Sequence, residues 1–533
     1  MDCTSTRLPY RQTGAFSNFI VDYIDQEQKL APFFTYQPSL TGIRAAIEAR
    51  KATPNDRHVL VSQLRKQYAG QPHYEKVNKN IELLASADTF TVTTAHQPNI
   101  FTGPLYFIYK IVHAIRLAGH LKDSLPGFNF VPVYYMGSED ADLDELGHIH
   151  LEGKKLSWET KQTGAVGRMK VDKSFLQLID VIEGQLAVLP FGREIVSMLK
   201  DSYQPGRMIQ DATFELVNRL FAEKGLLVLI PDNAELKRLA ADIFKDDLLH
   251  QTPSELVGKT IESIDKAGYK VQANPREINL FYLTDGIRER IVKNSSGYKV
   301  KGTDILFSQE QMLKELDEHP ERFSPNVILR GIFQETILPN VAFIGGGGEI
   351  AYWLQYDGMF SHYKVPMPAL ILRNSFVIVE KGMQEKISRT GFTVEDFFQS
   401  DETLVNKLVE RDTKNPMKFN GSITRVEQLY DAFREQAGQV DVSLTKHVDA
   451  LKTRAVFRLQ ELEKKMFRAE KRKFQDQRRQ IQSIRQALFP GSDLQERYEN
   501  GCYYYAKWGS DFIDKIYENS LALEQEFVIL YER

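Results

Sequence analysis

TFTVTTAHQPNIFTGPLYFIYKIVHAIRLAGHLK, residues 89–122, is the stretch from which the fold can be deduced. Its first six residues are all β-branched or aromatic, as in a buried strand. Residues 105–122 have the apolar periodicity of a helix. Between them lies a polar loop that ends at Pro104, which suits the first turn of a helix because its φ angle is already helical. The stretch therefore predicts a strand, a loop and a helix in succession.

Further short apolar runs follow along the chain, at 130–136, 226–230, 340–344 and 369–372. Helical patterns lie between them, and strand–helix alternation of this kind predicts parallel βαβ units. The fold class that we expect is therefore α/β. Charged helices and two candidate strands, INLFYLTD and RERIVKN, interrupt the pattern within about 155–300, which predicts an inserted region.

A long polar helix with an apolar seam is predicted toward the C-terminal end. Between 441 and 488 apolar residues recur at alternating spacings of four and three, with one stutter, which is typical of a coiled coil. Lys473 and Gln477 fall on the continued seam, and Pro490 with Gly491 ends the helix. The partner is either another helix of the same chain or a second subunit. The seam consists of Leu444, Val448, Leu451, Ala455, Leu459, Leu462, Met466, Ala469, Ile481, Ile484 and Leu488.

The composition limits the class of function. Lys and Arg total 68 and Asp and Glu total 71, so the net charge is −3, which argues against a dedicated nucleic-acid binder. Two cysteines, Cys3 and Cys502, are too few for a disulfide scaffold or a paired-cysteine zinc site. The first residues lack the apolar core of a signal peptide, and no run approaches the roughly 18 apolar residues of a membrane span. A cytoplasmic protein without membrane contact is expected.

The loop after the first strand carries four side chains that suit ligand binding. His96, Gln97, Asn99 and Thr102 lie within seven residues, just before the helix. Free N–H groups at a helix start attract anions, and open α/β sheets bind ligands at the carboxyl ends of their strands. The loop therefore predicts a site for phosphate or ribose. A well-capped structural loop is the alternative.

An acidic segment, Gly137–His150, follows the next strand. Five carboxylates occupy seven positions, among them Glu139, Asp140 and Asp142. Such charges repel one another unless a cation, either Mg²⁺ or a substrate amine, neutralises them. One of them could also act as general base toward an attacking amine. The alternative is an acidic helix start that the helix dipole favours.

A third segment, Asn340–Trp353, places four glycines between an apolar strand and a helix. Glycines let the backbone approach a ligand closely and leave its N–H groups accessible. Neither of the two common nucleotide-binding glycine fingerprints is complete here. A tight structural turn is the alternative.

Arginines complete the candidates, because a guanidinium group binds carboxylate or phosphate through two parallel hydrogen bonds. A structural ion pair is the alternative for each one. The basic run Arg468–Lys473 could contact nucleic acid, and a solvated coiled-coil face is the other interpretation. The four candidate arginines are Arg288, Arg290, Arg330 and Arg373.

Taken together, these segments resemble the BshC family, the cysteine-adding enzymes of bacillithiol biosynthesis. The matching pieces keep the family's order from about residue 90 to 500. They are His96-Gln97, Thr102–Tyr106, Lys110, Gly137–His148, Ser324–Arg330, Phe333-Gln334, Leu338-Pro339, Gly345-Gly346, Gly348–Ile350, Met367-Pro368, Leu488–Pro490 and Leu494–Arg497.

The resemblance implies a Rossmann-like parallel-sheet core, related in architecture to class I synthetases, with a connecting-peptide insertion and a coiled-coil domain. It implies that the core comprises 1–155 and 301–380 and the insertion 156–300. The coiled-coil domain would be 381–505, used for homodimerisation, and 506–533 a C-terminal helix that returns to the core.

The resemblance also implies an activity, the addition of L-cysteine to the amino group of glucosaminyl-malate to form bacillithiol. Because a carboxylate does not acylate an amine unaided, we expect activation by ATP, most simply to cysteinyl-adenylate, with Mg²⁺ as an optional companion. No resident metal site is expected, and neither cysteine matches a site segment, so a protein thioester is not expected.

Roles follow from the resemblance residue by residue. The expected catalytic residues are His96, which would contact phosphate, with Glu139, Asp140 and Asp142. The arginines Arg288, Arg290, Arg330 and Arg373 would hold the malyl carboxylates. Expected nucleotide or substrate contacts are Gln97, Asn99, Thr102, Gly103, Tyr106, Gly345, Gly346, Gly348 and Glu349.

Two other functions stay open from the sequence alone. A synthetase-like RNA-binding protein would use the basic helix as its docking surface, and its binding would depend steeply on salt. A non-catalytic coiled-coil assembly protein would leave the clustered carboxylates and the glycine run without a role.

Overall fold

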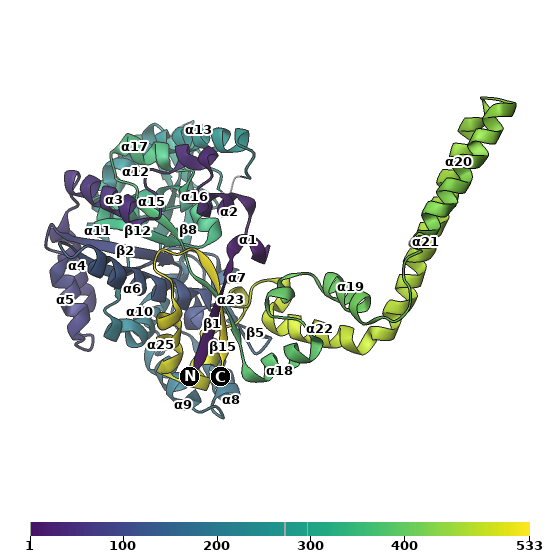
Figure 1. The fold of residues 1–533 in the computed structure, drawn as a ribbon. Helices are drawn as coiled ribbons and strands as arrows, with labels where there is room; N and C mark the ends of the chain where they lie inside the picture. The colour runs from purple at the N-terminus through teal and green to yellow at the C-terminus, as the bar shows by residue number, and fades with distance from the viewer. Residues whose placement is uncertain (1, 271–272, 296, 420) are drawn as a thin grey trace. The chain divides into compact units, whose positions relative to one another are not determined.

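The computed structural model describes residues 2–270, 273–295, 297–419 and 421–533. The chain forms two compact units. The first comprises Met1–Val379 together with Asp493–Arg533, and the second comprises Glu380–Ser492. Figure 1 shows that the strands belong to the first unit and that long helices make up the second.

Five parallel strands form the central sheet of the first unit, in the order β13-β12-β2-β3-β6. Numbered by their sequence, these strands lie in the order 5-4-1-2-3, which is the first five strands of the Rossmann order 3-2-1-4-5-6 read from the other edge. Each predicted apolar run became one of them, so the predicted parallel α/β fold is confirmed. The strands are β2 (Thr89–His96), β3 (Asn129–Met136), β6 (Leu227–Leu229), β12 (Asn340–Gly345) and β13 (Ala369–Leu372).

The main hydrophobic core lies between this sheet and two helices, α3 (Leu40–Ala52) and α6 (Tyr106–Ser124). All eight residues of β2 are buried, which explains why its sequence is a continuous apolar and β-branched run rather than an alternating one. The helix expected over 105–122 is α6, which begins one residue after Leu105. It connects β2 to β3 and carries the chain back along the sheet.

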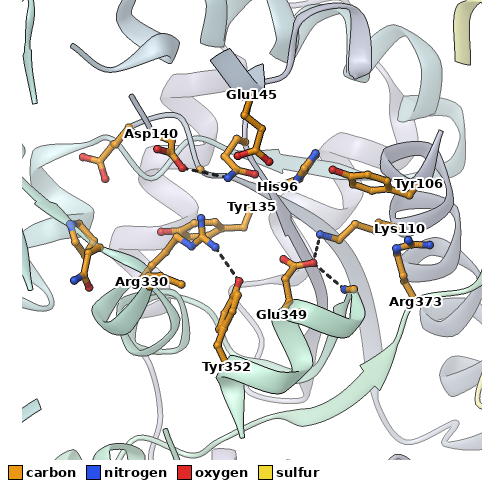
Figure 2. A pocket seen from close by; sticks show the side chains of 18 of the residues that line it. His96, Tyr106, Lys110, Tyr135, Asp140, Glu145, Arg330, Glu349, Tyr352 and Arg373 are labelled. Carbon is orange, nitrogen blue, oxygen red and sulfur yellow. Dashed lines mark hydrogen bonds and ion pairs between the residues drawn. The ribbon is translucent and has the colours of Figure 1, made fainter. Parts of the chain in front are cut away.

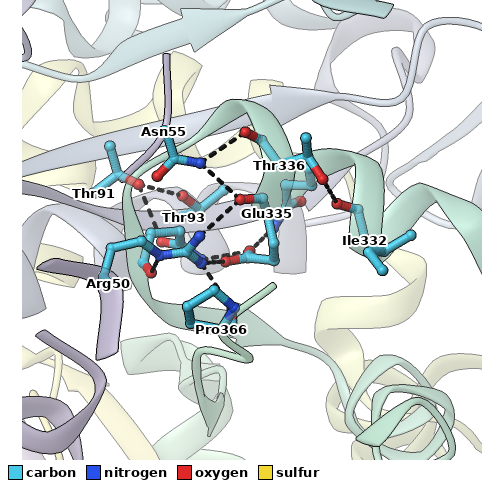
Figure 3. Close-up of polar contacts among 10 residues, drawn as sticks. Arg50, Asn55, Thr91, Thr93, Ile332, Glu335, Thr336 and Pro366 are labelled. Atoms are coloured by element: carbon cyan, nitrogen blue, oxygen red, sulfur yellow. Dashed lines mark hydrogen bonds and ion pairs between the residues drawn. The ribbon is translucent and has the colours of Figure 1, made fainter. Parts of the chain in front are cut away.

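A buried ion pair anchors the amino-terminal end of β12 (Figure 3). Arg50 Nη2 lies 2.7 Å from Glu335 Oε2, and the same guanidinium donates to the backbone carbonyls of Asn340 and Pro366. Burial, partly offset by Arg50, raises the pKa of Glu335 to about 7. Because the network sits at the opposite end of β12 from Gly345, it stabilises the sheet without occupying the carboxyl ends of its strands.

A second, three-stranded sheet joins the two ends of the described chain (Figure 1). β15 (Glu526–Glu532) lies between β1 (Cys3–Pro9), to which it is antiparallel, and β14 (Ser375–Val379), to which it is parallel. The helix expected over 506–533 is therefore only partly present. α25 (Ser510–Asn519) is helical, but the run EFVILYE is a strand, as its apolar and β-branched residues favour.

The region expected as an insertion over 156–300 is interleaved with the core, because β6 within it hydrogen-bonds to β3 of the central sheet. Its two predicted strands form the hairpin of β7 (Leu280–Thr284) and β8 (Ile287–Asn294). That hairpin belongs to a five-stranded sheet with β9 (Gly297–Val300), β10 (Leu306–Phe307) and β11 (Phe323–Pro325). A separate two-stranded hairpin consists of β4 (His148–Leu151) and β5 (Lys154–Ser157).

The remaining helices of the first unit surround these sheets. They are α1 (Tyr10–Thr13), α2 (Asn18–Ile24), α4 (Arg57–Tyr68), α5 (Glu75–Leu83), α7 (Leu143–Leu146), α8 (Lys173–Leu186), α9 (Gly192–Ser202), α10 (Ile209–Phe221), α11 (Ala234–Arg238), α12 (Ala241–Leu249), α13 (Thr252–Lys266), α14 (Gln309–Glu318), α15 (Val327–Ile337), α16 (Gly347–Trp353), α17 (Asp357–Tyr363), α23 (Gln495–Tyr498) and α24 (Gly501–Trp508).

In the second unit the predicted seam helix pairs with a helix of the same chain. α20 (Ser422–Val440) and α21 (Leu444–Lys471) form an antiparallel hairpin, held in part by an ion pair between Arg434 and Asp449. Figure 1 shows the two helices side by side. Leu444, Leu451 and Leu462 of the seam stay exposed in this hairpin.

The seam helix is not continuous to 488 as expected. A 3₁₀ turn at Arg472–Phe474 separates α21 from α22 (Gln475–Leu488). Polar Lys473 lies on the seam at this turn, so the apolar stripe is interrupted there. α22 instead buries Ile481 and Ile484 against the two other helices of this unit, α18 (Lys381–Thr390) and α19 (Asp401–Asp412).

Candidate active site

The carboxyl ends of the core strands surround one cavity of about 340 Å³. β2 ends at His96, β3 at Met136 and β12 at Gly345, and the loops that follow them line the cavity. β2 has β3 as its neighbour on one side and β12 on the other, so the strand order reverses at β2. Open α/β sheets bind ligands in the crevice at such a switch point. The cavity is therefore the candidate active site (Figure 2).

His96 lies in the cavity wall and is 7% exposed. Its ring packs against those of Tyr106 and Phe107, with ring centroids 5.3 and 5.5 Å away. Its Nε2 has no hydrogen-bond partner among the described residues. Burial, together with nearby cations such as Lys110 and Arg330, lowers the pKa of His96 well below its usual range. His96 is therefore a neutral imidazole in the cavity wall whose buried Nε2 has no partner among the described residues.

The rest of the predicted binding loop does not line the cavity, except for Gln97 and Tyr106. Thr102 and Gly103 have φ angles of 70° and 62°, and a Cβ on Gly103 would lie 2.7 Å from the Cβ of Asn99. Asn500 holds this turn by donating from Nδ2 to the carbonyl of Gly103 at 2.5 Å. Asn99, Thr102 and Gly103 therefore shape the loop through a partner that local spacing does not reveal.

Lys110 and Glu349 connect α6 to α16 at the cavity (Figure 2). Lys110 Nζ lies 2.5 Å from Glu349 Oε2 and donates to the carbonyl of Ala95 at 2.6 Å. The same Glu349 oxygen accepts the N–H of Gly346 at 2.8 Å and so caps α16. Burial, opposed by Glu349, lowers the pKa of Lys110. Lys110 lies on the same side of α6 as Tyr106, four residues earlier, and that spacing could have identified it.

Part of the glycine run lines the cavity with its backbone, as predicted. Gly346–Gly348 line the cavity, whereas Gly345 does not. A Cβ on Gly345 would lie 2.9 Å from the ring of Phe343, so this glycine is required by packing within the strand.

The predicted acidic cluster divides into cavity residues and a helix cap. Glu139, Asp140 and Glu145 line the cavity. Asp142 is exposed, and its Oδ1 accepts the N–H of Glu145 at 3.1 Å as the N-cap of α7. Asp142 therefore lies outside the cavity, because the unpaired N–H groups of the helix start bind its carboxylate. Asp140 instead accepts from Gln97 Nε2 at 3.1 Å.

The two adjacent carboxyls in the cavity have pKa values shifted in opposite directions. Burial raises the pKa of Glu139 and Lys237 opposes it. Burial would also raise the pKa of Asp140, but Arg288 and Gln97 outweigh it, so that pKa is lowered. Pairs of carboxyls whose pKa values are pushed apart are typical of acid–base sites.

Two of the predicted arginines present positive charge to the cavity. Arg330 donates from Nη2 to the hydroxyl of Tyr352 at 3.0 Å, and no carboxylate within the described residues lies at salt-bridge distance from it. Arg288 is 3.8 Å from Asp140, a long ion pair, and its Nε donates to Ser324 Oγ at 3.1 Å. Both guanidinium groups therefore retain capacity for an anionic ligand.

The other two arginines are placed differently. Arg373 lines the cavity, but its Nη2 lies 2.7 Å from Glu496 Oε1 and its Nη1 donates to Ser375 Oγ at 3.2 Å. Glu496 is fully buried, so Arg373 is its structural counter-ion. Arg290 does not line the cavity.

Several residues at the cavity were given no role from the sequence. Tyr135 points into the cavity from the end of β3, where strand alternation could have found it. Arg497 comes from α23, after the second unit of the chain, and no local pattern links it to the first strand. Further such residues are Lys110 and Tyr352 in the cavity wall and Lys237 behind it.

The donor set does not suit a resident metal ion. Among the described residues, no group of three or more His, Cys, Asp or Glu side chains is arranged to hold one. Neither cysteine lines the cavity, and burial raises the pKa of Cys502 to about 12. In the described part of the chain, no helix has both the length and the apolar character needed to cross a membrane.

Comparison with known proteins gives full-length matches. The model of the bacillithiol biosynthesis BshC N-terminal Rossmann-like domain matches residues 1–374, and that of the BshC C-terminal coiled-coil domain matches 376–532. Relatives named "Putative cysteine ligase BshC" include one from Flavobacterium psychrophilum, 39% identical, and one from Flavobacterium johnsoniae, 37% identical, each covering 99% of both chains. Another from Cytophaga hutchinsonii is 38% identical over 96% of both chains.

A solved structure from Campylobacter jejuni, described as a "putative arginyl t-RNA synthetase", covers 82% of this chain and 94% of its own at 9% identity. Its TM-score is 0.22, so it supports no conclusion about this chain.

Proposed function

The chain belongs to the BshC family of bacillithiol biosynthesis, and from that membership we propose that it joins L-cysteine to the amino group of glucosaminyl-malate. The product would be the thiol bacillithiol, formed through a new amide bond. The observation that carries the proposal is the cavity at the strand switch point, where guanidinium and carboxylate groups face the same space.

The cationic side of the cavity suits the malyl group. Malate carries two carboxylates, and Arg330 and Arg288 have guanidinium nitrogens that are unpaired or only weakly paired. Guanidinium forks bind carboxylates through two parallel hydrogen bonds. We propose that these two arginines bind the malyl carboxylates. Arg373 instead forms the structural ion pair with Glu496.

Activation of the cysteine carboxylate requires a reactive leaving group, for which ATP is the proposed source. The carboxylate oxygen would attack the α-phosphorus and release pyrophosphate, giving cysteinyl-adenylate. The unpaired Nε2 of His96 and the backbone of Gly346–Gly348 are the groups proposed to contact phosphate. Mg²⁺, if it takes part, would enter with the nucleotide phosphates, since the donor set suits no resident ion.

Amide formation then needs a proton acceptor. As the amine nitrogen of glucosaminyl-malate bonds to the activated carbonyl carbon, AMP leaves and the nitrogen loses a proton. Of the carboxylates in the cavity wall, Glu349 is bonded to Lys110 and Glu145 is exposed. We therefore propose that Glu139 or Asp140 takes the proton.

Dimerisation through the coiled-coil domain is also proposed. The α20–α21 hairpin leaves apolar seam residues such as Leu451 and Leu462 exposed, and a second copy of the hairpin would cover them. We propose a cytoplasmic location, because ATP and free cysteine are the proposed substrates.

The test uses the full-length purified chain with ATP, Mg²⁺, cysteine and glucosaminyl-malate. Mass spectrometry should detect the thiol product together with AMP, and omission of ATP should abolish both. Product formation without ATP would contradict the activation step alone. Absence of product with all components present would contradict the proposed function.

A further inference from the structure

A buried lysine lies directly behind the cavity carboxyl Glu139. Lys237, on α11, is fully buried, and its Nζ contacts Glu139 Oε1. The same ammonium group lies 3.3 Å from Asp232 Oδ1 and donates to the carbonyl of Glu321 at 3.0 Å. An ammonium group has three N–H donors, and each of them has an acceptor here. The position of the Lys237 ammonium group is therefore fixed by all three.

A second cation completes the network. Arg168 donates to Asp232 through both Nε and Nη2, each at 2.7 Å, in a bidentate ion pair. Asp232 is thereby held in place on the far side of Lys237. The network contains two cations and two carboxylates, so its charges balance while Glu139 is ionised.

Only one oxygen of Glu139 is used by this network. Within the described residues no donor reaches its other oxygen, and Glu139 lines the cavity. The charged and titratable groups that face Glu139 are Lys237, Asp232, Arg288, Arg168 and Tyr135.

Asp140 is arranged differently, because both of its oxygens have partners. Oδ2 accepts from Gln97 at 3.1 Å, and Oδ1 accepts the N–H of Ala141 at 2.8 Å and faces Arg288. A carboxylate engaged in this way is held ionised and has no free oxygen for a proton.

We propose that Lys237 is a positioning residue that holds the Glu139 carboxylate with one oxygen toward the cavity, so that Glu139 is the group that accepts the proton from the attacking amine. This inference rests on the proposed function. The new O–H bond would form on the free Glu139 oxygen as the N–H bond of the amine breaks. Asp232 remains paired with both cations, so the network tolerates the neutral Glu139.

The first test needs no substrate. Thermal stability of the wild type is compared with Glu139→Gln across pH, with and without Lys237→Met. Since the pKa of Glu139 is raised, its stabilising contribution is complete below the unfolded value of about 4.3 and is lost as pH rises through the folded pKa. Removing Lys237 should raise that pKa further, so the loss should extend to higher pH. An identical pH dependence in both backgrounds would show that Lys237 does not act on Glu139.

The second test measures turnover. Lys237→Met should lower the rate at pH 7 by roughly 10²-fold, as for a lost general base, and move the acid limb upward by roughly one pH unit or more. In the Glu139→Gln background, Lys237→Met should lower the rate little further, because Lys237 acts on the rate only through the Glu139 carboxylate. Additive rate losses would overturn the inference.

Two further variants keep the result interpretable. Lys237→Arg retains the charge but not the three-acceptor geometry, so it should keep the acid limb near its wild-type pH while losing rate. It also serves if Lys237→Met does not fold, and wild-type turnover in Lys237→Arg would then contradict the positioning role. Glu335→Gln, which disrupts a buried ion pair outside the cavity, should lower stability and leave the acid limb in place. If the wild type forms no product, the proposed function fails, while the substrate-free titration still decides whether Lys237 controls Glu139.

Discussion

Lys110 and Glu349 bridge the helices that follow β2 and β12, with Lys110 Nζ 2.5 Å from Glu349 Oε2. The two residues are 239 positions apart in the chain, yet the pair sits where the strand order reverses. Because the same carboxylate oxygen caps α16, the ion pair also fixes the glycine backbone that lines the cavity.

Breaking this pair should destabilise the protein. Lys110→Met removes the counter-ion of a partly buried carboxylate, and the free energy of unfolding should fall by about 3–5 kcal/mol. Lys110→Met/Glu349→Gln should recover part of that loss, because no charge is left unpaired. Urea denaturation measures the free energy of unfolding of both variants. A Lys110→Met variant as stable as the wild type would contradict the structural role of the ion pair.

His96→Ala should lower product formation by roughly 10²-fold without unfolding the protein, as for a lost phosphate contact in the transition state. Because the pKa of His96 lies well below its usual range, His96 should add no inflection to the pH–rate profile near pH 6.5. His113 is a matched control, since it is buried but bonded at both nitrogens, to Ala522 and Asn374. His113→Ala should lower the melting temperature instead. Unchanged turnover in His96→Ala would return the loop to a structural role.

The arginines should differ in what their loss affects. Arg330→Lys removes the second donor of a bidentate contact, so KM for glucosaminyl-malate should rise roughly tenfold or more, with little change for cysteine and ATP. Arg373→Lys should mainly reduce stability, because it disturbs the ion pair with buried Glu496. Equal changes in KM for every substrate in both variants would mean that neither arginine binds malate.

Substitutions in the acidic segment should affect either stability or activity, depending on whether the residue caps α7 or lines the cavity. Asp142→Asn should cost about 0.3–1 kcal/mol of stability, the value of a charge at a helix start, with activity intact. Asp140→Asn should depress the rate, since it removes the carboxylate that faces Arg288 and accepts from Gln97 beside the proposed base Glu139. Melting temperature and turnover measured on both variants test the division. A fully active Asp140→Asn would place that residue among the structural ones.

Removal of the α20–α21 hairpin should abolish dimerisation. Replacing residues 422–471 with a short linker deletes both helices together, so neither is left with an uncovered apolar face. Light scattering should then report a monomer where the full chain is a dimer. A dimer that survives the deletion would place the interface on another part of the chain.

The fold could be predicted from the sequence where the signal is local. All five core strands appear as short apolar runs, because strands buried on both faces need no polar alternation. The strand at Glu526–Glu532 lies in a segment expected to be helical. Its composition favours a strand, but its partners β1 and β14 are distant in the chain, so no local pattern indicates the sheet that it completes. The break at Arg472–Phe474 was missed because a polar residue on a seam is compatible with either a continuous helix or its interruption.

The candidate site could be predicted where residues directly follow a core strand. His96, Gln97, Asp140 and Gly346 were found in that way, since parallel strands bring their carboxyl ends to one edge. Lys237 could not be found, because it reaches Glu139 from a separate helix. For the same reason nothing local distinguishes Arg373, which is neutralised by Glu496, from the unpaired Arg330.

The three-stranded sheet has a consequence for synthesis of the chain. β15 lies between β1 and β14, yet it is translated last of the three, and Cys3 pairs with Glu532. Until β15 is synthesised, the edges of β1 and β14 that face it have unpaired N–H and C=O groups. Open edges of this kind invite pairing with other chains. The facing edges of β1 and β14 are therefore open to such pairing until β15 is made.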